Sequence, residues 1–229
     1  MTDQTAPLHW RETDAGRVPV SDQFDDPYYS LVGGLDETRH VFVNGNDLPA
    51  RWDQDLQIAE LGFGTGLNLL VTWADWMKAP HGALHFTSFE AFPMDKADMA
   101  DALSAFPELA DFGAILLDRW SAGDGPVALA EGLTLEVIIG DARQTLPAWQ
   151  GRADVWYLDG FSPAKNPQLW EPALLQAVAD HTNAGGTAAT YSAAGHVRQS
   201  LTQAGFAVSR VKGFGTKRHM TVAEMSDAE

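Results

Sequence analysis

The chain has 229 residues, enough for one α/β domain with a full hydrophobic core and too few for two complete enzymes. Hydrophobic residues make up 45% of it, but no apolar run reaches the roughly 18 residues of a membrane helix, which excludes a membrane-spanning protein. The absence of cysteine excludes disulfides, thiolate nucleophiles and thiolate metal ligands. A net charge of −16 at pH 7 disfavours indiscriminate binding to nucleic acid, because a polyanion is repelled.

The charge is unevenly distributed along the chain. Between His181 and Ala223 there is no Asp or Glu, yet this stretch contains Arg198, Arg210, Lys212, Lys217 and Arg218. These residues form either the solvated faces of a helix and edge strands or a phosphate-facing surface. The first residues, MTDQTAPLHWRET, lack the basic start and apolar stretch of a secretory signal, so we expect a cytoplasmic protein.

Residues 1–52 precede the main domain as an N-terminal extension. In it, LHWRE, the turn signal TDAGR and VPVSD predict a β-hairpin, and the aromatic-rich segments DPYYS and HVFVNGN follow. We expect the extension to pack as a lid or rim on a domain formed by residues 53–229.

That domain is predicted to be a seven-stranded, mostly parallel sheet with helices on both faces. The β-rich runs are residues 56–61, 84–90, 134–140, 153–159, 187–192, 206–211 and 220–225, and the helical segments are residues 67–77, 94–106, 167–181 and 193–204. Only a short Gly-rich link precedes the last run, so the last strand must be antiparallel, because a parallel crossover needs a dozen or more residues.

The loop after the first strand, in AELGFGTGLN (residues 59–68), carries Gly62, Gly64 and Gly66. In an open parallel sheet this loop is the expected ligand-binding loop, and glycines let its backbone approach a ligand closely. A dinucleotide fingerprint needs a glycine where Leu67 stands. The spacing G-x-G-x-G after Glu60 is instead typical of S-adenosylmethionine (SAM) methyltransferases, in which Glu60 can complement the cationic amino group of SAM. The alternative is a tight strand-to-helix turn without a ligand.

Two further acids stand at the ends of the next strands. Glu90 closes the second strand, where a carboxylate can accept both ribose hydroxyls, and Asp141 follows the third, where it can accept the adenine amine. Each alone is more typical of a solvated loop. Together, and combined with the glycine loop, the two acids favour a SAM site. The segment NAGGT before the fifth strand is a further match to the usual order of motifs in methyltransferases.

The fourth strand runs into DGFSPAKNP, residues 159–167. An acid followed by an aromatic residue and a proline-stiffened loop is typical of amine methyltransferases; the alternative is a turn that caps the next helix. An alkylamine with a pKa of about 10.4 is mostly protonated at pH 7, so presenting it neutral costs about 4.6 kcal/mol. We therefore expect Asp159 to orient the amine and accept its proton, while alignment supplies most of the acceleration.

Other candidate sites are weaker. His81 and His85 have an i, i+4 spacing, but they lie across a loop and a strand start, so we predict no metal site. No Ser, His and Asp set occurs in a nucleophile-elbow context. Trp170 can shape the pocket behind the Asp159 loop.

Together, DQFDDPYYS, GLDETRHVFVNGN, AELGFGTGLN, YLDGFSPAKNPQLW, TYSAAGHVR and GFGTKRHM resemble one family. It comprises the tRNA 5-aminomethyl-2-thiouridine methyltransferases, which occur alone as MnmD and as the N-terminal domain of bifunctional MnmC. The resemblance runs from about residue 8 to residue 225. It implies a class I SAM-dependent methyltransferase fold, which is Rossmann-like.

The resemblance also implies the reaction. SAM methylates the amine of 5-aminomethyl-(2-thio)uridine at the wobble position, in the anticodon loop of tRNA. Bifunctional relatives carry an FAD-dependent oxidase that first removes a carboxymethyl group. A chain of 229 residues has no room for that domain, so we expect a separate oxidase or pathway enzyme to supply the aminomethyl substrate. A wobble base lies in a single-stranded loop, so it can be splayed into a pocket.

By the same resemblance, Asp159 is the catalytic acid, and the cofactor contacts are Glu60, Gly62, Gly64, Gly66, Glu90 and Asp141. Tyr29 and residues 37–39 close over the cofactor or base. The substrate contacts are Phe161, Pro163, Lys165, Lys217 and Arg218. The loop Gly213–Met220 departs from the family pattern at Thr216 and His219, which puts its contact with tRNA in doubt.

Two other functions fit the same residues. One is a SAM-dependent N-methyltransferase of a small-molecule or protein amine, which the acidic charge favours. The other is a non-catalytic SAM-binding scaffold, against which Asp159 and its proline loop count.

Overall fold

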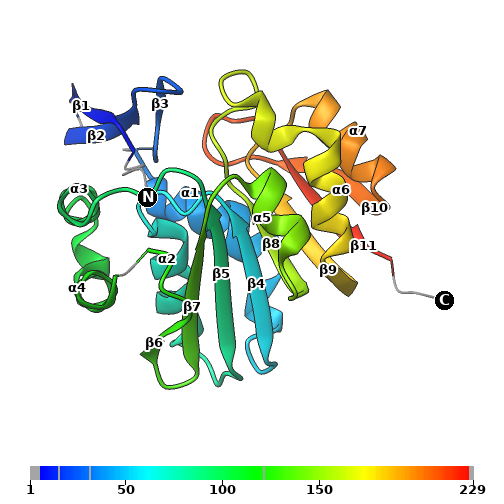
Figure 1. Cartoon of the computed structure of the whole chain (residues 1–229), viewed down its shortest axis with the longest axis horizontal. Helices are drawn as coiled ribbons and strands as arrows, with labels where there is room; N and C mark the ends of the chain where they lie inside the picture. Colours follow the sequence, from blue (N-terminus) through cyan, green and yellow to red (C-terminus); the bar gives the residue numbers. More distant parts are fainter. Residues whose placement is uncertain (1–5, 15, 31, 121, 227–229) are drawn as a thin grey trace.

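A computed structural model of the chain describes residues 6–14, 16–30, 32–120 and 122–226 (Figure 1). Its centre is an eight-stranded sheet in the order β10-β11-β9-β8-β4-β5-β7-β6. The strands are β4 Leu56–Leu61, β5 Leu84–Glu90, β6 Val127–Ala130, β7 Leu133–Ile139, β8 Ala153–Leu158, β9 Thr182–Thr190, β10 Phe206–Lys212 and β11 His219–Met225. None of the helices in the described residues is both long and apolar enough to span a bilayer.

The predicted fold class is confirmed, because the five central strands β9, β8, β4, β5 and β7 run parallel. The last strand, β11, lies between β10 and β9 and is antiparallel to both, as the short link required. The eighth strand, β6, is not among the predicted strands. It has four residues, pairs antiparallel with β7 and contains a register shift between Ala128 and Ala130, so its pattern is too short to stand out.

Helices cover both faces of the sheet (Figure 1). They are α1 Gly34–Thr38, α2 Leu67–Trp76, α3 Lys96–Leu103, α4 Ala110–Arg119, α5 Ala142–Ala148, α6 Pro172–Asp180 and α7 Gly195–Gln203. Alternate residues of β4 enter different cores: Ile58 packs with residues of α2, α3 and α4, and Leu61 packs with residues of α5, α6 and α7. The buried strands therefore separate two hydrophobic layers.

Two helical segments differ from the prediction because of particular residues. The segment 167–181 is a 3-10 helix over Pro167–Trp170 and then α6, because Glu171 is extended before Pro172. Within 94–106 the helix begins at Lys96, because the Asp95 side chain caps it by accepting from two backbone N–H groups. Helices α4 and α5 are not among the predicted helices, and NAGGT lies inside β9 rather than before it.

The N-terminal extension begins with the predicted hairpin, β1 Leu8–Thr13 and β2 Gly16–Ser21. A two-residue strand β3 Asp26–Pro27 follows, then α1, a π-helix over Arg39–Asn44 and a 3-10 helix over Leu48–Ala50. Its apolar side chains join the core on the α2 face of the sheet, where Phe42 stacks on Tyr157 of β8 at 5.0 Å. The division at residue 52 stays a prediction, since extension and sheet share this core.

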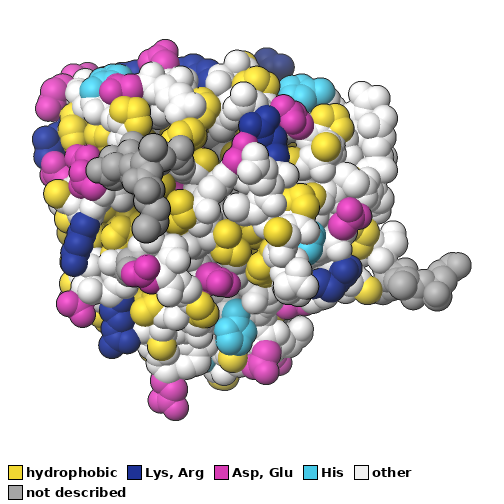
Figure 2. All heavy atoms as spheres, in the orientation of Figure 1, with side chains coloured by type: hydrophobic (Ala, Val, Ile, Leu, Met, Phe, Trp, Pro, Cys, Tyr) yellow, Lys and Arg dark blue, Asp and Glu magenta, His cyan; other side chains and the backbone are white. Residues whose placement is uncertain are grey.

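Figure 2 shows the face of the molecule seen in Figure 1. Asp and Glu side chains are scattered over it, with Lys, Arg and hydrophobic side chains between them. The described residues form no continuous basic surface on this face.

Candidate active site

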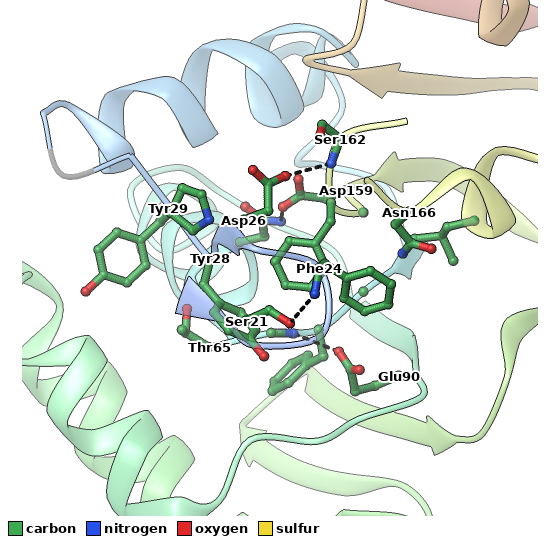
Figure 3. Close-up of a pocket in the computed structure, with 18 of the residues that line it drawn as sticks. Ser21, Phe24, Asp26, Tyr28, Tyr29, Thr65, Glu90, Asp159, Ser162 and Asn166 are labelled. Carbon is green, nitrogen blue, oxygen red and sulfur yellow. Dashed lines mark hydrogen bonds between the residues drawn. The ribbon is translucent and has the colours of Figure 1, made fainter. Parts of the chain in front are cut away.

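A cavity of about 530 Å³ lies beyond the carboxyl ends of β4, β5 and β8 (Figure 3). Strand β4 lies between β5 and β8, and the chain reaches these neighbours in opposite directions across the sheet, which makes this edge the topological switch point. One wall comes from the loops after these strands, and another comes from residues 21–30 and 34–42 of the extension. The volume is in the usual range for small-molecule sites.

The glycine loop lies against the loop that follows β8. All three glycines have positive φ, 91° at Gly62, 53° at Gly64 and 78° at Gly66. A Cβ at Gly62 would lie 2.5 Å from the Asp159 carbonyl oxygen, so only glycine permits this approach. Gly62 and Gly64 line the cavity, whereas Gly66 faces Leu116 and Phe63 and starts α2.

Glu90 and Glu60 have different surroundings. Glu90 lines the cavity, and its carboxylate accepts hydrogen bonds from Gly64 N at 3.0 Å and Phe92 N at 2.8 Å. Burial raises its pKa, and these backbone donors oppose the rise. Glu60 is fully buried below the loop, where Asn68 Nδ2 donates to Oε1 and Ser88 Oγ donates to Oε2. Burial raises its pKa also, and Glu60 does not line the cavity.

Asp141 lines the cavity as the N-cap of α5. Its carboxylate accepts from the backbone N–H of Arg143 at 2.9 Å and forms an ion pair with that guanidinium at 2.6 Å. The hydrogen bonds from Arg143 hold its pKa below the ordinary value. Its contact with adenine stays a prediction.

Asp159 follows β8 directly and lines the cavity. Asn68 Nδ2 donates to its Oδ2 at 2.6 Å. Burial raises its pKa to about 7; the Asn68 hydrogen bond and the charge of Lys217 oppose the rise, and the charge of Glu37 adds to it. A carboxyl group with a pKa near neutrality is suited to general acid–base catalysis.

The loop after Asp159 is held by the N-terminal extension. Ser162 N donates to Asp26 Oδ2 at 2.8 Å (Figure 3). The Phe161 ring lies 5.0 Å from the ring of Phe24 and 5.1 Å from that of Tyr28. These three side chains give the cavity an aromatic wall.

The remaining predicted substrate residues are not all at the cavity. Phe161 and Lys217 line it, whereas Pro163, Lys165 and Arg218 do not. Lys165 Nζ pairs instead with the carboxylate of Asp26 at 3.4 Å, which fastens the loop from outside.

Lys217 closes one side of the cavity by an ion pair with Glu37 at 2.6 Å. Its ammonium lies 5.1 Å from the centre of the Tyr191 ring. The Tyr191 hydroxyl in turn donates to the carbonyl of Gly160 at 2.7 Å. These contacts connect the 213–218 loop, α1 and the Asp159 loop.

Sequence reasoning missed several residues of the site. Tyr29 lines the cavity, and its contact with the cofactor stays a prediction; its hydroxyl donates to the carbonyl of Ala102, and its ring points away from the centre of the site (Figure 3). Tyr28 is the ring beside Gly64, where an added Cβ would lie 3.2 Å from it. Phe24, Tyr191 and Asn68 are not among the predicted site residues either. The signal for Asn68 was present, because it ends the motif AELGFGTGLN.

His81 stacks on Trp76 at 3.7 Å. Within the described ranges, no group of three or more His, Cys, Asp or Glu side chains could hold a metal ion. The Trp170 indole donates to the carbonyl of Phe161 at 2.9 Å, so it supports the pocket loop from behind.

The residues of the glycine loop fit SAM. Backbone at Gly62 and Gly64 borders the cavity without side chains, and Glu90 presents carboxylate oxygens beside it. These groups suit a ligand with hydroxyl donors and positive charge, and Asp141 adds a further acceptor. No pyrophosphate-binding glycine is needed, which agrees with Leu67 in the third fingerprint position.

Known proteins similar to the chain point to the same class. The chain is 44% identical, over 99% of its length, to the tRNA 5-methylaminomethyl-2-thiouridine biosynthesis bifunctional protein MnmC of Vibrio campbellii. It is 45% identical over 97% of its length to MnmC of Vibrio cholerae serotype O1. The chain spans only about a third of these relatives, 36% and 35% of their lengths.

A solved structure agrees over the whole fold. The crystal structure of MNMC2 from Aquifex aeolicus matches with a TM-score of 0.79 and 26% identity, covering 99% of this chain and 74% of that one. The family model for S-adenosyl-L-methionine-dependent methyltransferases matches residues 107–226. The predicted resemblance, with SAM as cofactor, is confirmed: the chain belongs to the S-adenosyl-L-methionine-dependent methyltransferase family.

Proposed function

We propose that the chain methylates the primary amine of 5-aminomethyl-(2-thio)uridine at the wobble position of tRNA, giving the 5-methylaminomethyl form. The observation that carries the proposal is the carboxyl of Asp159, which lines a cavity between the glycine loop and an aromatic wall. The similarity of almost the whole chain to proteins named for 5-methylaminomethyl-2-thiouridine biosynthesis supports this choice of amine.

Asp159 has the properties that amine methylation needs. The acceptor nitrogen must lose a proton before its lone pair can react, and an alkylammonium holds that proton with a pKa of about 10.4. A carboxylate with an ordinary pKa is a weak acceptor, but burial raises the pKa of Asp159 to about 7. Asp159 therefore takes up the proton of the ammonium, which frees the nitrogen lone pair, and orients the neutral amine by a hydrogen bond before the new N–C bond forms.

We propose that the cofactor side of the cavity consists of the glycine-loop backbone, Glu90 and Asp141. When bound, SAM supplies an electrophilic methyl group. The contribution of these residues is alignment, which is worth about 7–11 kcal/mol when the reacting atoms are held in line. Glu60 acts from below, because both its oxygens already accept hydrogen bonds inside the protein.

The aromatic wall suits a flipped pyrimidine. Phe24, Tyr28 and Phe161 pack edge to face or tilted with centres about 5 Å apart, and all three line the cavity. Unpaired bases are commonly bound by stacking on such rings. A wobble uridine needs no helix to be opened, which lowers the cost of bringing it into the site.

Contact with the tRNA backbone is assigned to the basic residues of the last third of the chain. Arg210 and Lys212 lie on the exposed edge strand β10, and Arg218 is exposed near it. Lys217 is paired with Glu37, so we assign it to the cavity rather than to phosphate. Few basic contacts on an acidic protein predict weak binding that depends strongly on salt.

The reaction requires a primary amine on the uridine. We propose that a separate oxidase, or a pathway enzyme that makes the aminomethyl group directly, supplies it, and that the reaction takes place in the cytoplasm. The region that this chain matches is 36% of the bifunctional relative from Vibrio campbellii, so the rest of that protein is outside it.

The test is nucleoside mass spectrometry of tRNA that bears 5-aminomethyl wobble uridine, incubated with the protein and SAM. One added methyl on that nucleoside is expected, and Asp159→Asn should slow its appearance by about 10²–10⁴. Asp154→Asn is the matched control, because Asp154 lies at the other end of β8 and binds Gln57 N. If SAM binds but only small amines are methylated, the substrate assignment is wrong; if nothing is methylated, the scaffold function replaces it.

A further inference from the structure

We propose that Asn68 is a positioning residue that holds Asp159 in place by bridging it to Glu60. The inference rests on the proposed function in one respect, namely that Asp159 is the proton acceptor. Asn68 is the second residue of α2, directly after the glycine loop, and is buried with only 6% of its surface exposed. It therefore connects the cofactor loop with the loop after β8.

One amide group makes three hydrogen bonds. Asn68 Nδ2 donates to Glu60 Oε1 at 2.8 Å and to Asp159 Oδ2 at 2.6 Å, and its Oδ1 accepts from Thr38 Oγ1 at 3.1 Å. The two hydrogens of the amide are thus both used. The orientation of the amide follows from its partners, because carboxylates accept and only the Thr38 hydroxyl is free to donate.

The bridge leaves one oxygen of Asp159 for the substrate. In the part of the chain that the structure describes, no other group donates a hydrogen bond to the Asp159 carboxyl. Oδ2 is held by Asn68, and Oδ1 keeps its lone pairs for an amine in the cavity. Holding one oxygen restricts rotation of the carboxyl, which is the kind of alignment on which catalysis depends.

The bridge also affects how Asp159 binds a proton. The charge of Glu37 raises the pKa of Asp159 and that of Lys217 lowers it, and Glu60 and Tyr191 lie near enough for Asp159 to raise their pKa values. A donated hydrogen bond favours the carboxylate, so Asn68 lowers the pKa that burial raises. Loss of Asn68 should shift the titration of Asp159 to higher pH.

The experiment compares Asn68→Leu with Asn46→Leu. Asn46 is also buried, does not itself line the cavity, and donates to the backbone carbonyl of Phe42 without contacting Asp159. Carbon-13 NMR of protein labelled at Asp side chains gives the titration of Asp159, which Asp159→Asn assigns. Asn68→Leu is expected to raise its proton affinity about tenfold, and Asn46→Leu should leave it unchanged.

Kinetics supply a second readout. We expect Asn68→Leu to lower kcat of methyl transfer by about 10² while the KM for SAM stays within a few-fold. Thermal unfolding of both variants separates this effect from general destabilisation. If Asn46→Leu loses kcat equally, the loss in Asn68→Leu does not result from the positioning of Asp159, and Asn68 has only a structural role.

Thr38→Val keeps the test open if Asn68→Leu does not fold. It removes the hydroxyl that orients the amide without touching Asp159 and should shift the same titration in the same direction, by less. An unchanged Asp159 titration in a folded Asn68→Leu or Thr38→Val protein overturns the proposal. Because NMR needs no tRNA, absence of methylation on 5-aminomethyl uridine would refute the proposed function and leave this measurement decisive for Asn68.

Discussion

Asp26 and Ser162 are 136 residues apart in the chain and joined by a hydrogen bond, from Ser162 N to Asp26 Oδ2 at 2.8 Å. The bond fastens the N-terminal extension to the loop that carries Phe161. The ion pair of Asp26 with Lys165 strengthens the same junction. The Asp26 carboxylate therefore helps to hold the aromatic wall in position relative to Asp159, together with the Trp170 hydrogen bond to the Phe161 carbonyl.

Replacement of Asp26 should separate these two roles. Asp26→Asn keeps an acceptor for Ser162 N but loses the charge opposite Lys165, whereas Asp26→Ala loses both. We expect Asp26→Ala to raise the KM for the RNA substrate at least about tenfold and to cost about 1–3 kcal/mol of stability, because Ser162 N loses its partner. Asp26→Asn should be milder. Steady-state kinetics and denaturant unfolding measure both effects, and equal behaviour of the two variants would contradict the role of the hydrogen bond.

The pH dependence should report Asp159. The profile of kcat/KM should rise with pH through an inflection near 7, where Asp159 loses its proton. In Asp159→Asn that inflection should disappear, while the slower rise toward the amine pKa remains. Asp154→Asn should keep the wild-type inflection, and an unchanged profile in Asp159→Asn would assign it to another group.

Stability should change with pH for the same reason. The pKa of Asp159 is raised from 3.8 to about 7, so between these pH values the folded protein holds a proton that the unfolded chain has released. The contribution of this group to stability is therefore lost as pH rises through that window. The stability of Asp159→Asn minus that of the wild type should therefore be larger at pH 8 than at pH 4. Thermal unfolding midpoints at the two pH values measure the difference; a gap that does not grow with pH would contradict burial as its cause.

Gly62→Ala should disrupt the cofactor side of the site. Its Cβ would lie 2.5 Å from the Asp159 carbonyl oxygen, at a backbone φ of +91° that disfavours any side chain. Calorimetry should show loss of SAM binding together with lower stability. Gly195→Ala, at the start of α7 with open space around it, is the control and should be neutral or stabilising by up to about 1 kcal/mol. Normal SAM affinity in Gly62→Ala would show that the close approach can relax.

Arg218 and Lys217 should behave differently although they are neighbours. Arg218→Ala should weaken tRNA binding and lower the slope of log affinity against log salt by about 0.7 if it neutralises one phosphate of a single strand. Lys217→Met should instead raise the pKa of Asp159, because the positive charge of Lys217 lowers that pKa. Fluorescence anisotropy over a salt series and the NMR titration distinguish them. If the substrate is a small amine, turnover should depend neither on Arg218 nor on the salt concentration.

The site residues that can be predicted best from the sequence are those at the carboxyl ends of the parallel strands. Parallel strands end at one edge of a sheet, so the order of strands along the chain is enough to group Glu60, Glu90, Asp141 and Asp159. Whether each faces the cavity or the interior depends on the loop after it, which is why Glu60 is predicted to contact the cofactor and is instead buried without lining the cavity.

Other features depend on tertiary packing. Tyr28 and Tyr29 are adjacent in the bend after β3, and both line the cavity. Composition does not reveal that the Tyr28 ring borders Gly64 while the Tyr29 hydroxyl bonds to Ala102. The direction of Asn68 follows from the turn at Gly66 where α2 starts. Strand β6 is stable only as an edge on β7, since four residues do not form a strand by themselves.

The two walls of the cavity come from separate stretches of the chain. Strand ends and the glycine loop form the wall that we assign to the methyl donor, and residues 21–30 and 34–42, which precede the eight-stranded sheet, form most of the aromatic wall that we assign to the acceptor. Selectivity for the group that receives the methyl can therefore change through substitutions in about twenty contiguous residues, with the cofactor side unaltered. For redesign, the N-terminal extension is therefore the segment in which to vary acceptor specificity, while the side chains that it contributes to the shared core are kept.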